Sequence, residues 1–245
     1  MRASNFSTID FSVKQSVATI TLNRPDARNA VNLAMCEDLL TAARAAAADE
    51  SLRLLFIRGA GPVFCAGADL KERSGKAREW VRERRLKAFA AYDAIGSLPM
   101  PVVAVVHGAA LGAGVEIAAV CDFVVATPDA VFGTPEAQRG TVGATQRLPR
   151  IIGKRLAKDL MFTGRRLSAE EARLAGFVSR IYEQNALEKA IEEIATSILA
   201  APPAAIRLAK RCIDRGVELD PQGALAVELA AIDEQLASGS WLGKQ

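Results

Sequence analysis

Histidine and cysteine are scarce in this sequence, and their scarcity excludes several kinds of site. The single histidine, His107, follows an apolar run and precedes a glycine, where we expect a structural role. The four cysteines form no C-x-x-C pair, and we expect them to be small buried thiols in a reducing cytosol (Cys36, Cys65, Cys121 and Cys212). Neither a zinc site nor a disulfide framework is therefore predicted.

The signature motifs of three common enzyme classes are also missing. No G-x-S-x-G turn supplies a nucleophile for a catalytic triad, and no G-x-G-x-x-G or Walker A motif favours a nicotinamide or a nucleoside triphosphate. The 31 basic and 28 acidic residues leave a net charge of +3, and a charge this small does not indicate a nucleic-acid partner. No metal is expected. The catalytic groups that these absences leave open are carboxylates and backbone amides.

Long apolar runs are absent as well. No stretch approaches the roughly 18 uninterrupted apolar residues of a membrane span. The opening segment, MRASNFSTIDF, lacks the basic and apolar parts of an export signal. We therefore expect a cytoplasmic protein that makes no use of a membrane.

The pattern along the chain predicts an α/β core followed by helices alone. Residues 17–22 alternate with period two, which is typical of a strand, and a hairpin with residues 9–13 is expected. Asn32 is a candidate N-cap for a helix, and the apolar runs 102–106 and 123–126 predict buried strands. From about residue 185 only helical patterns follow. We therefore divide the chain into a core at 1–184 and a helical region at 185–245.

Two glycine-rich segments and two glutamates carry the chemistry. In residues 63–72 and 105–116, small residues allow a ligand to approach the main chain, whose free N–H groups could bind a developing enolate oxygen. Glu116 lies on the first turn of a predicted helix, and Glu136 follows the next strand. Adding water to a carbon–carbon double bond needs a base for the water and an acid for the carbon. Two carboxyl groups with separated proton affinities can fill both roles.

Several motifs, in order and near the usual spacing, make the chain resemble the crotonase (enoyl-CoA hydratase/isomerase) family over about residues 8 to 220. They are Phe64-Cys-Ala-Gly-Ala-Asp69, Ala110-Leu-Gly-Ala-Gly-Val-Glu116, Phe132-Gly-Thr-Pro-Glu136, Thr145-Gln-Arg-Leu148 and Thr163-Gly-Arg-Arg-Leu-Ser168. The segment Asp69-Leu-Lys-Glu-Arg73, together with residues 205–218, favours the methylglutaconyl-CoA hydratase-like branch.

The resemblance implies a fold, an assembly and a set of site residues. The fold would be a spiral of ββα turns with a C-terminal helical region that forms trimers or dimers of trimers. The resemblance places the oxyanion hole at the amides of Ala68 and Ala113 and the catalytic carboxylates at Glu116 and Glu136. It also implies that the following residues bind the substrate or its coenzyme A moiety: Arg28, Ala66, Asp69, Leu70, Lys71 and Gly112. Coenzyme A belongs to the substrate, so no cofactor is expected.

Two segments depart from the family pattern. The run from Gly140 to Gln146 is a few residues shorter than the glycine-rich loop that usually follows the second glutamate, which predicts altered water placement or substrate size. At the C-terminus, Ser240-Trp-Leu-Gly-Lys-Gln245 stands where the family usually has a last helix, so we expect a shortened helical region and a more open CoA pocket.

The function expected from these features is reversible syn hydration of a 2-enoyl-CoA to a 3-hydroxyacyl-CoA. Two glutamates favour a hydratase over an isomerase, which can operate with one, but isomerisation of a double bond or another crotonase-type reaction stays open. A role of another class, non-catalytic or RNA-binding, also stays open, because residues 71–87 hold eight basic against three acidic residues and could bind RNA or the phosphates of CoA. A solvated helix face is the simpler interpretation of that charge, so nucleic acid is not the expected partner.

Overall fold

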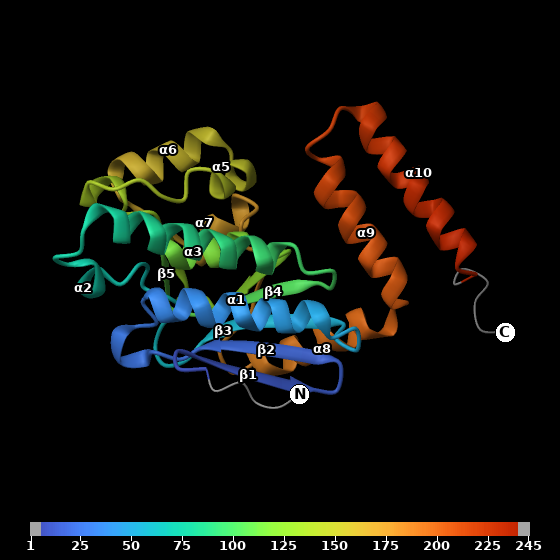
Figure 1. The fold of residues 1–245 in the computed structure, drawn as a ribbon, viewed down its shortest axis with the longest axis horizontal. Helices are drawn as coiled ribbons and strands as arrows, with labels where there is room; N and C mark the ends of the chain where they lie inside the picture. Colours follow the sequence, from blue (N-terminus) through green and yellow to red (C-terminus); the bar gives the residue numbers. More distant parts are fainter. Residues whose placement is uncertain (1–5, 240–245) are drawn as a thin grey trace.

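The computed structural model describes residues 6–239, which form two β-sheets surrounded by helices (Figure 1). The larger sheet has six strands in the order β1-β2-β3-β4-β6-β9, antiparallel between β1 and β2 and parallel elsewhere. Its strands are β1 (Ile9–Lys14), β2 (Val17–Leu22), β3 (Leu54–Gly59), β4 (Val102–Val106), β6 (Phe123–Ala126) and β9 (Arg180–Ile181).

The smaller sheet gives the fold its spiral character. It contains β5 (Ala109–Leu111), β7 (Val131–Gly133) and β8 (Arg166–Ser168), with β5 and β7 parallel. Single bridge residues extend this stack in the same parallel sense, through the pairs Cys65–Ala110 and Val31–Ala68. Successive turns of chain thus add one strand to the large sheet and one strand or bridge to the small one. The spiral of ββα turns is confirmed.

Helices alternate with these strands, and local sequence signals begin several of them. The Asn32 side chain accepts the N–H of Met35 at 2.9 Å and starts α1, so the predicted N-cap is confirmed. A capping box between Ser168 and Glu171 starts α7. The helices of the core are α1 (Leu33–Ala48), α2 (Leu70–Arg73), α3 (Arg78–Gly96), α4 (Ala113–Ala119), α5 (Arg147–Ile152), α6 (Lys154–Thr163) and α7 (Ala169–Leu174), with 3-10 turns η1 (Pro25–Ala27) and η2 (Ala137–Arg139).

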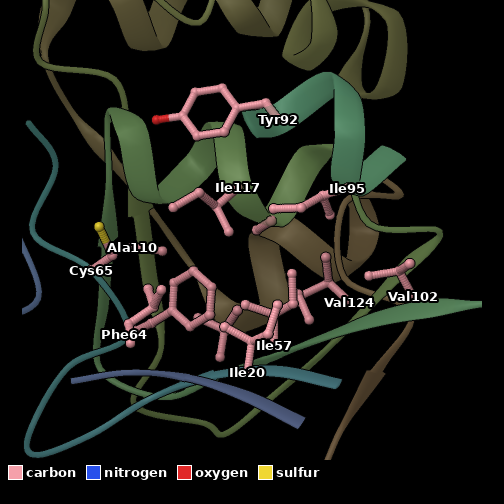
Figure 2. Packing of buried hydrophobic residues seen from close by; sticks show 14 of the residues in the cluster. Ile20, Ile57, Phe64, Cys65, Tyr92, Ile95, Val102, Ala110, Ile117 and Val124 are labelled. Atoms are coloured by element: carbon pink, nitrogen blue, oxygen red, sulfur yellow. The ribbon is translucent and has the colours of Figure 1, made fainter. Parts of the chain in front are cut away.

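The central strands β3, β4 and β6 of the large sheet are buried on both faces. One face packs against α1, α3 and α4, and Figure 2 shows Ile20, Ile57 and Val124 of the strands gathered near Ile95 of α3 and Ile117 of α4. The other face carries a second apolar cluster that includes residues of α8 (Leu187–Ala200). Continuous apolar strands such as β4 follow from this double coverage, because both sets of side chains avoid water.

Helices α8, α9 (Pro203–Gly216) and α10 (Pro221–Ala237) form the C-terminal segment, as the helical patterns predict. Helix α8 packs on the sheet, whereas α9 and α10 pair with each other and stand beside the core (Figure 1). The domain boundary at 184/185 stays a prediction, and the expectation for residues 240–245 falls outside the described residues. Within residues 6–239, no helix combines the length and apolar character needed to cross a bilayer.

Candidate active site

A cavity of about 370 Å³ lies between helix α3, the segment 66–74, the start of α4 and the loop 135–143. Both predicted glutamates line it: Glu116 from the first turn of α4, and Glu136 from the N-cap position of η2. Glu116 is buried, with 9% of its surface exposed, which excludes a solvated surface position. The fold therefore brings together two carboxyl groups that are twenty residues apart in the chain.

Two backbone amides in the cavity wall have no hydrogen-bond partner among residues 6–239. Ala68 lies in a bridge with Val31 whose hydrogen bonds use the carbonyl of Gly67 and the amide of Asp69, so the Ala68 N–H points the other way. Ala113 is the first residue of α4, where amides have no partner within the helix. Both residues line the cavity, so their N–H groups are available to a ligand.

The segments that carry these amides lie next to each other. A Cβ added to Gly67 would come within 4.0 Å of the Ala113 nitrogen and 3.0 Å of the Leu111 carbonyl oxygen. The parallel bridge between Cys65 and Ala110 holds the two segments in this register. The separation of the amides is thus set by backbone pairing and not by side chains.

Gly112 lets the Glu136 carboxylate approach the start of α4. Its backbone has φ +50°, which favours glycine, and a Cβ there would lie 2.5 Å from Oε1 of Glu136. The Gly112 N–H is not available to a ligand, because it donates to the carbonyl of Gly133 at 2.8 Å. Gly112 therefore allows close packing of Glu136 beside the Ala113 amide.

Burial raises the pKa of both carboxyl groups. For Glu116, desolvation raises the pKa, Arg147 opposes it, and the charge of Glu136 raises it further. For Glu136, desolvation again dominates and raises the pKa, while its own backbone amide, Arg139 and Arg85 oppose the shift. The glutamates are therefore coupled through their charges, and a state in which one of them holds a proton is favoured.

The two carboxyl groups differ in their hydrogen-bond surroundings. The Ala144 amide lowers the pKa of Glu116, and the backbone amide of Glu136 likewise lowers the pKa of Glu136. Oε2 of Glu136 is buried without any hydrogen-bond partner in the described part of the chain. Accepting an N–H favours the ionised form, whereas an unpartnered buried oxygen favours the neutral form.

Seven of the ten sequence-predicted site residues line the cavity, namely Ala66, Ala68, Leu70, Gly112, Ala113, Glu116 and Glu136. Arg28, Asp69 and Lys71 do not. The Arg28 carbonyl accepts the amide of Ala66 at 2.9 Å, and the Asp69 carboxylate caps α2 and pairs with Arg24 at 2.9 Å. Through these contacts Arg28 and Asp69 have a structural role, because they hold the segment that carries Ala68.

Four arginines in the cavity wall were not recognised from the sequence: Arg73, Arg84, Arg85 and Arg139. Three of them, Arg73, Arg84 and Arg85, belong to the charged run 71–87, of which α3 forms most, and for Arg84 and Arg85 the interpretation as a solvated helix face is wrong. Arg84 is buried and Arg85 is half-buried. The signal that could have found them is their spacing, since Val81, Arg84, Ala88 and Tyr92 share one helix face.

The histidine and the cysteines take no part in the cavity wall. Nε2 of His107 lies 2.8 Å from the Gly61 carbonyl oxygen, a structural contact. Burial raises the pKa of Cys36 to about 11 and of Cys65 to about 12, so both thiols stay protonated. Cys121 and Cys212 are only partly buried, which corrects the expectation that all four cysteines are buried.

Comparison with known proteins agrees with this geometry. A family model described as enoyl-CoA hydratase/isomerase matches residues 12–239. The chain is 42% identical over 224 residues to enoyl-CoA hydratase domain-containing protein 2, mitochondrial, of Homo sapiens, covering 87% of this chain and 76% of that protein. It is 36% identical over 233 residues to methylglutaconyl-CoA hydratase, mitochondrial, of Mus musculus, covering 91% and 74%.

A solved structure shares the fold as well. The enoyl-CoA hydratase of Bacillus anthracis superposes with a TM-score of 0.89 at 37% identity, covering 93% of this chain and 90% of that one. Relatives with different names thus show similar identity to this chain, and the lean toward the methylglutaconyl-CoA hydratase-like branch stays a prediction.

Proposed function

Because the chain belongs to the enoyl-CoA hydratase/isomerase (crotonase) family, whose members act on acyl-CoA thioesters, we propose that it adds water reversibly to a 2-enoyl-CoA. The observation that carries this proposal is the pair of carboxyl groups, Glu116 and Glu136, in one cavity with two unpartnered amides. The product is the 3-hydroxyacyl-CoA.

The amides of Ala68 and Ala113 stabilise the charge that develops on the thioester oxygen. When water attacks the β-carbon, the electrons of the double bond move toward the carbonyl and form an enolate. Preorganised N–H donors stabilise such an oxyanion because they need no rearrangement at the moment of reaction. Neither amide serves another partner within residues 6–239, so both are free to donate to this oxygen.

The surroundings of the two carboxyl groups support a distinct role for each. Glu116, whose ionised form is favoured by the charge of Arg147, is the base that takes a proton from the attacking water. Glu136, with its unpartnered buried oxygen, holds the proton that it delivers to the α-carbon. Glu116 gains one proton and Glu136 loses one, so the total number of protons on the pair is unchanged. In the reverse reaction Glu116 is then the acid and Glu136 is the base.

Loss of the conjugated enoyl-thioester absorbance on mixing with 2-enoyl-CoA substrates of several chain types tests the reaction. We expect hydration, with the 3-hydroxyacyl-CoA identified by mass. If 3-enoyl-CoA is converted to 2-enoyl-CoA while no 2-enoyl-CoA takes up water, the isomerase reading replaces the hydratase proposal.

For the assembly we propose a homotrimer or a dimer of trimers formed through α9 and α10. Their outer surfaces carry exposed apolar side chains that a monomer leaves in water, namely Ile213, Val217, Leu225, Leu229, Ile232 and Leu236, between 42% and 76% exposed. Light scattering at micromolar concentration should give three or six times the 26.0 kDa chain mass. A stable monomer would contradict the proposal.

A further inference from the structure

Helix α3 brings one tyrosine to the wall of the active-site cavity. Tyr92 is only 2% exposed, and its ring belongs to the main apolar cluster together with Ile95 and Ile117 (Figure 2). The ring also meets Phe89 edge-on, with 6.4 Å between the ring centroids. Figure 2 shows the hydroxyl on the side of the ring that is turned away from Ile95. Packing of the ring therefore fixes the position of the hydroxyl.

The Tyr92 hydroxyl is open to the cavity and has no protein partner. It makes no hydrogen bond within residues 6–239. In this part of the chain, the unpartnered side-chain nitrogens and oxygens that protein atoms enclose completely belong to Arg53, Arg84, Thr134 and Glu136, and not to Tyr92. The Tyr92 oxygen therefore borders open space, and the active-site cavity is the space that Tyr92 lines.

Tyr92 lies in the buried part of the cavity, where the acyl group of a thioester fits. Leu70 and Val142 are exposed and mark the mouth, whereas Ala88 and Tyr92 are buried. The coenzyme part of an acyl-CoA is much larger than a short acyl group, so it has to extend through the mouth into solvent. The acyl group at the other end of the thioester therefore occupies the buried part, and Tyr92 faces it.

An acyl group that fills this space decides whether the hydroxyl has a partner. Solvent can satisfy the hydroxyl of an open cavity, but a plain alkyl chain would displace the water and leave the hydroxyl buried and unpaired, which is costly. A carboxylate would be buried opposite one neutral donor, since the neighbouring wall residues of α3 are Ala88 and Phe89, and an unpaired buried charge costs more still. Burial also raises the pKa of Tyr92, so the hydroxyl stays protonated and can donate. The group that matches it is an uncharged oxygen.

We propose that the Tyr92 hydroxyl donates a hydrogen bond to an uncharged oxygen of the acyl group, so that the preferred substrates are enoyl-CoA thioesters whose acyl chain carries a carbonyl or hydroxyl group. This inference rests on the proposed function for the reaction and names the class of acyl group. Tyr92 is then a specificity-determining residue. A site that pairs with a ligand oxygen discriminates against an analogue without it, because the protein donor is left unpaired.

Binding of saturated thioesters measures this preference without turnover, because they have no double bond to hydrate. We compare 4-oxopentanoyl-CoA with 4-methylpentanoyl-CoA, and 5-oxohexanoyl-CoA with 5-methylhexanoyl-CoA. In each pair a carbonyl oxygen replaces a methyl group of similar size. Calorimetry on the wild-type protein should show the oxo thioester of at least one pair bound ~5- to 100-fold more tightly, which reflects the cost of leaving a buried hydroxyl unpaired. Equal affinities in both pairs, or tighter binding of both methyl thioesters, would overturn the proposal.

The variant Tyr92→Phe traces the preference to one atom, because it removes only the hydroxyl oxygen from a packed ring. It should weaken binding of the oxo thioester and strengthen binding of the methyl thioester, whereas a loss of packing alone would weaken both. The matched control is Tyr182→Phe, which changes the other tyrosine of the chain. Tyr182 packs against the second apolar cluster, outside the cavity wall, so this variant should preserve the preference. A preference that survives Tyr92→Phe would remove Tyr92 from the proposal.

Turnover of the 2-enoyl counterparts of these thioesters distinguishes this inference from the proposed function. The ratio of kcat/KM for the oxo substrate to that for the methyl substrate should be higher in the wild type than in Tyr92→Phe. Comparing the two proteins cancels the difference in intrinsic reactivity between the substrates. If no 2-enoyl thioester is hydrated while oxo thioesters still bind in preference through Tyr92, oxygen recognition stands and the hydration proposal fails. If all are hydrated with a ratio that Tyr92→Phe leaves unchanged, hydration stands and oxygen recognition fails.

Discussion

Replacing Glu116 or Glu136 with glutamine is expected to lower kcat for hydration by about 10²- to 10⁴-fold, the usual contribution of a general acid or base. Both side chains line the same cavity, and glutamine keeps their size while removing the transferable proton. Affinity for a saturated acyl-CoA should change little, because the thioester is held elsewhere. Steady-state kinetics and calorimetry on the same preparations check both statements. Near-normal hydration by Glu116→Gln would exclude the two-carboxylate mechanism.

The variant Glu116→Gln should also be more stable than the wild type at neutral pH. Because the native state raises the pKa of Glu116, it binds a proton more tightly than the unfolded chain does. The stabilising contribution of the neutral form is complete below the unfolded pKa and is lost as pH rises through the raised native pKa. Glutamine has no such loss. Thermal unfolding should therefore show a Tm gain for Glu116→Gln at pH 7 that disappears at acidic pH, and an unchanged Tm at both would contradict this reasoning.

The variant Ala113→Pro is expected to cost ~10²–10³ in kcat, about 3–4 kcal/mol of transition-state stabilisation, through loss of one oxyanion donor. Proline removes the N–H and is tolerated at the first position of a helix, which is where Ala113 lies. No protein hydrogen bond is lost with it, since this amide has no partner within residues 6–239. The loss should therefore appear in catalysis more than in folding.

Ala113→Gly is the matched control, because it removes the side chain and keeps the amide. Its turnover should stay close to that of the wild type. Circular dichroism and light scattering on both variants would verify fold and assembly. A folded and fully active Ala113→Pro protein would remove the Ala113 amide from the mechanism and leave the thioester oxygen without its second donor.

Local signals predicted much of the fold correctly. The β1–β2 hairpin follows from strict alternation, the start of α1 from the side chain of Asn32, and the short helix α4 from a glycine-rich turn after a strand. Each of these depends on residues within one element. The three-residue strands β5, β7 and β8 were not predicted, because so short a segment has no measurable period and gains its structure from neighbours distant in sequence.

The candidate site shows the same limit. Glu116 and the amides of Ala68 and Ala113 could be proposed because they sit in turns whose motifs are recognisable. Arg85 could not, since a charged residue in a charged helix looks the same in sequence whether it faces water or a cavity. What separates the two cases is how α3 rests on α1, which turns the Arg85 face toward the cavity. The rotation of α3 about its own axis is set by its packing against α1.

The parallel bridge between Cys65 and Ala110 has a consequence for how such a site can diverge. On the mechanism proposed above, main-chain amides activate the thioester, whereas two side chains, which mutation can replace, transfer the protons. A single substitution at Glu116 or Glu136 would keep the thioester activated but remove one of the two proton-transfer groups. The substrate would then have to react in another way. New reactions on acyl-CoA can therefore arise by changing one carboxylate, with no need to rebuild the scaffold.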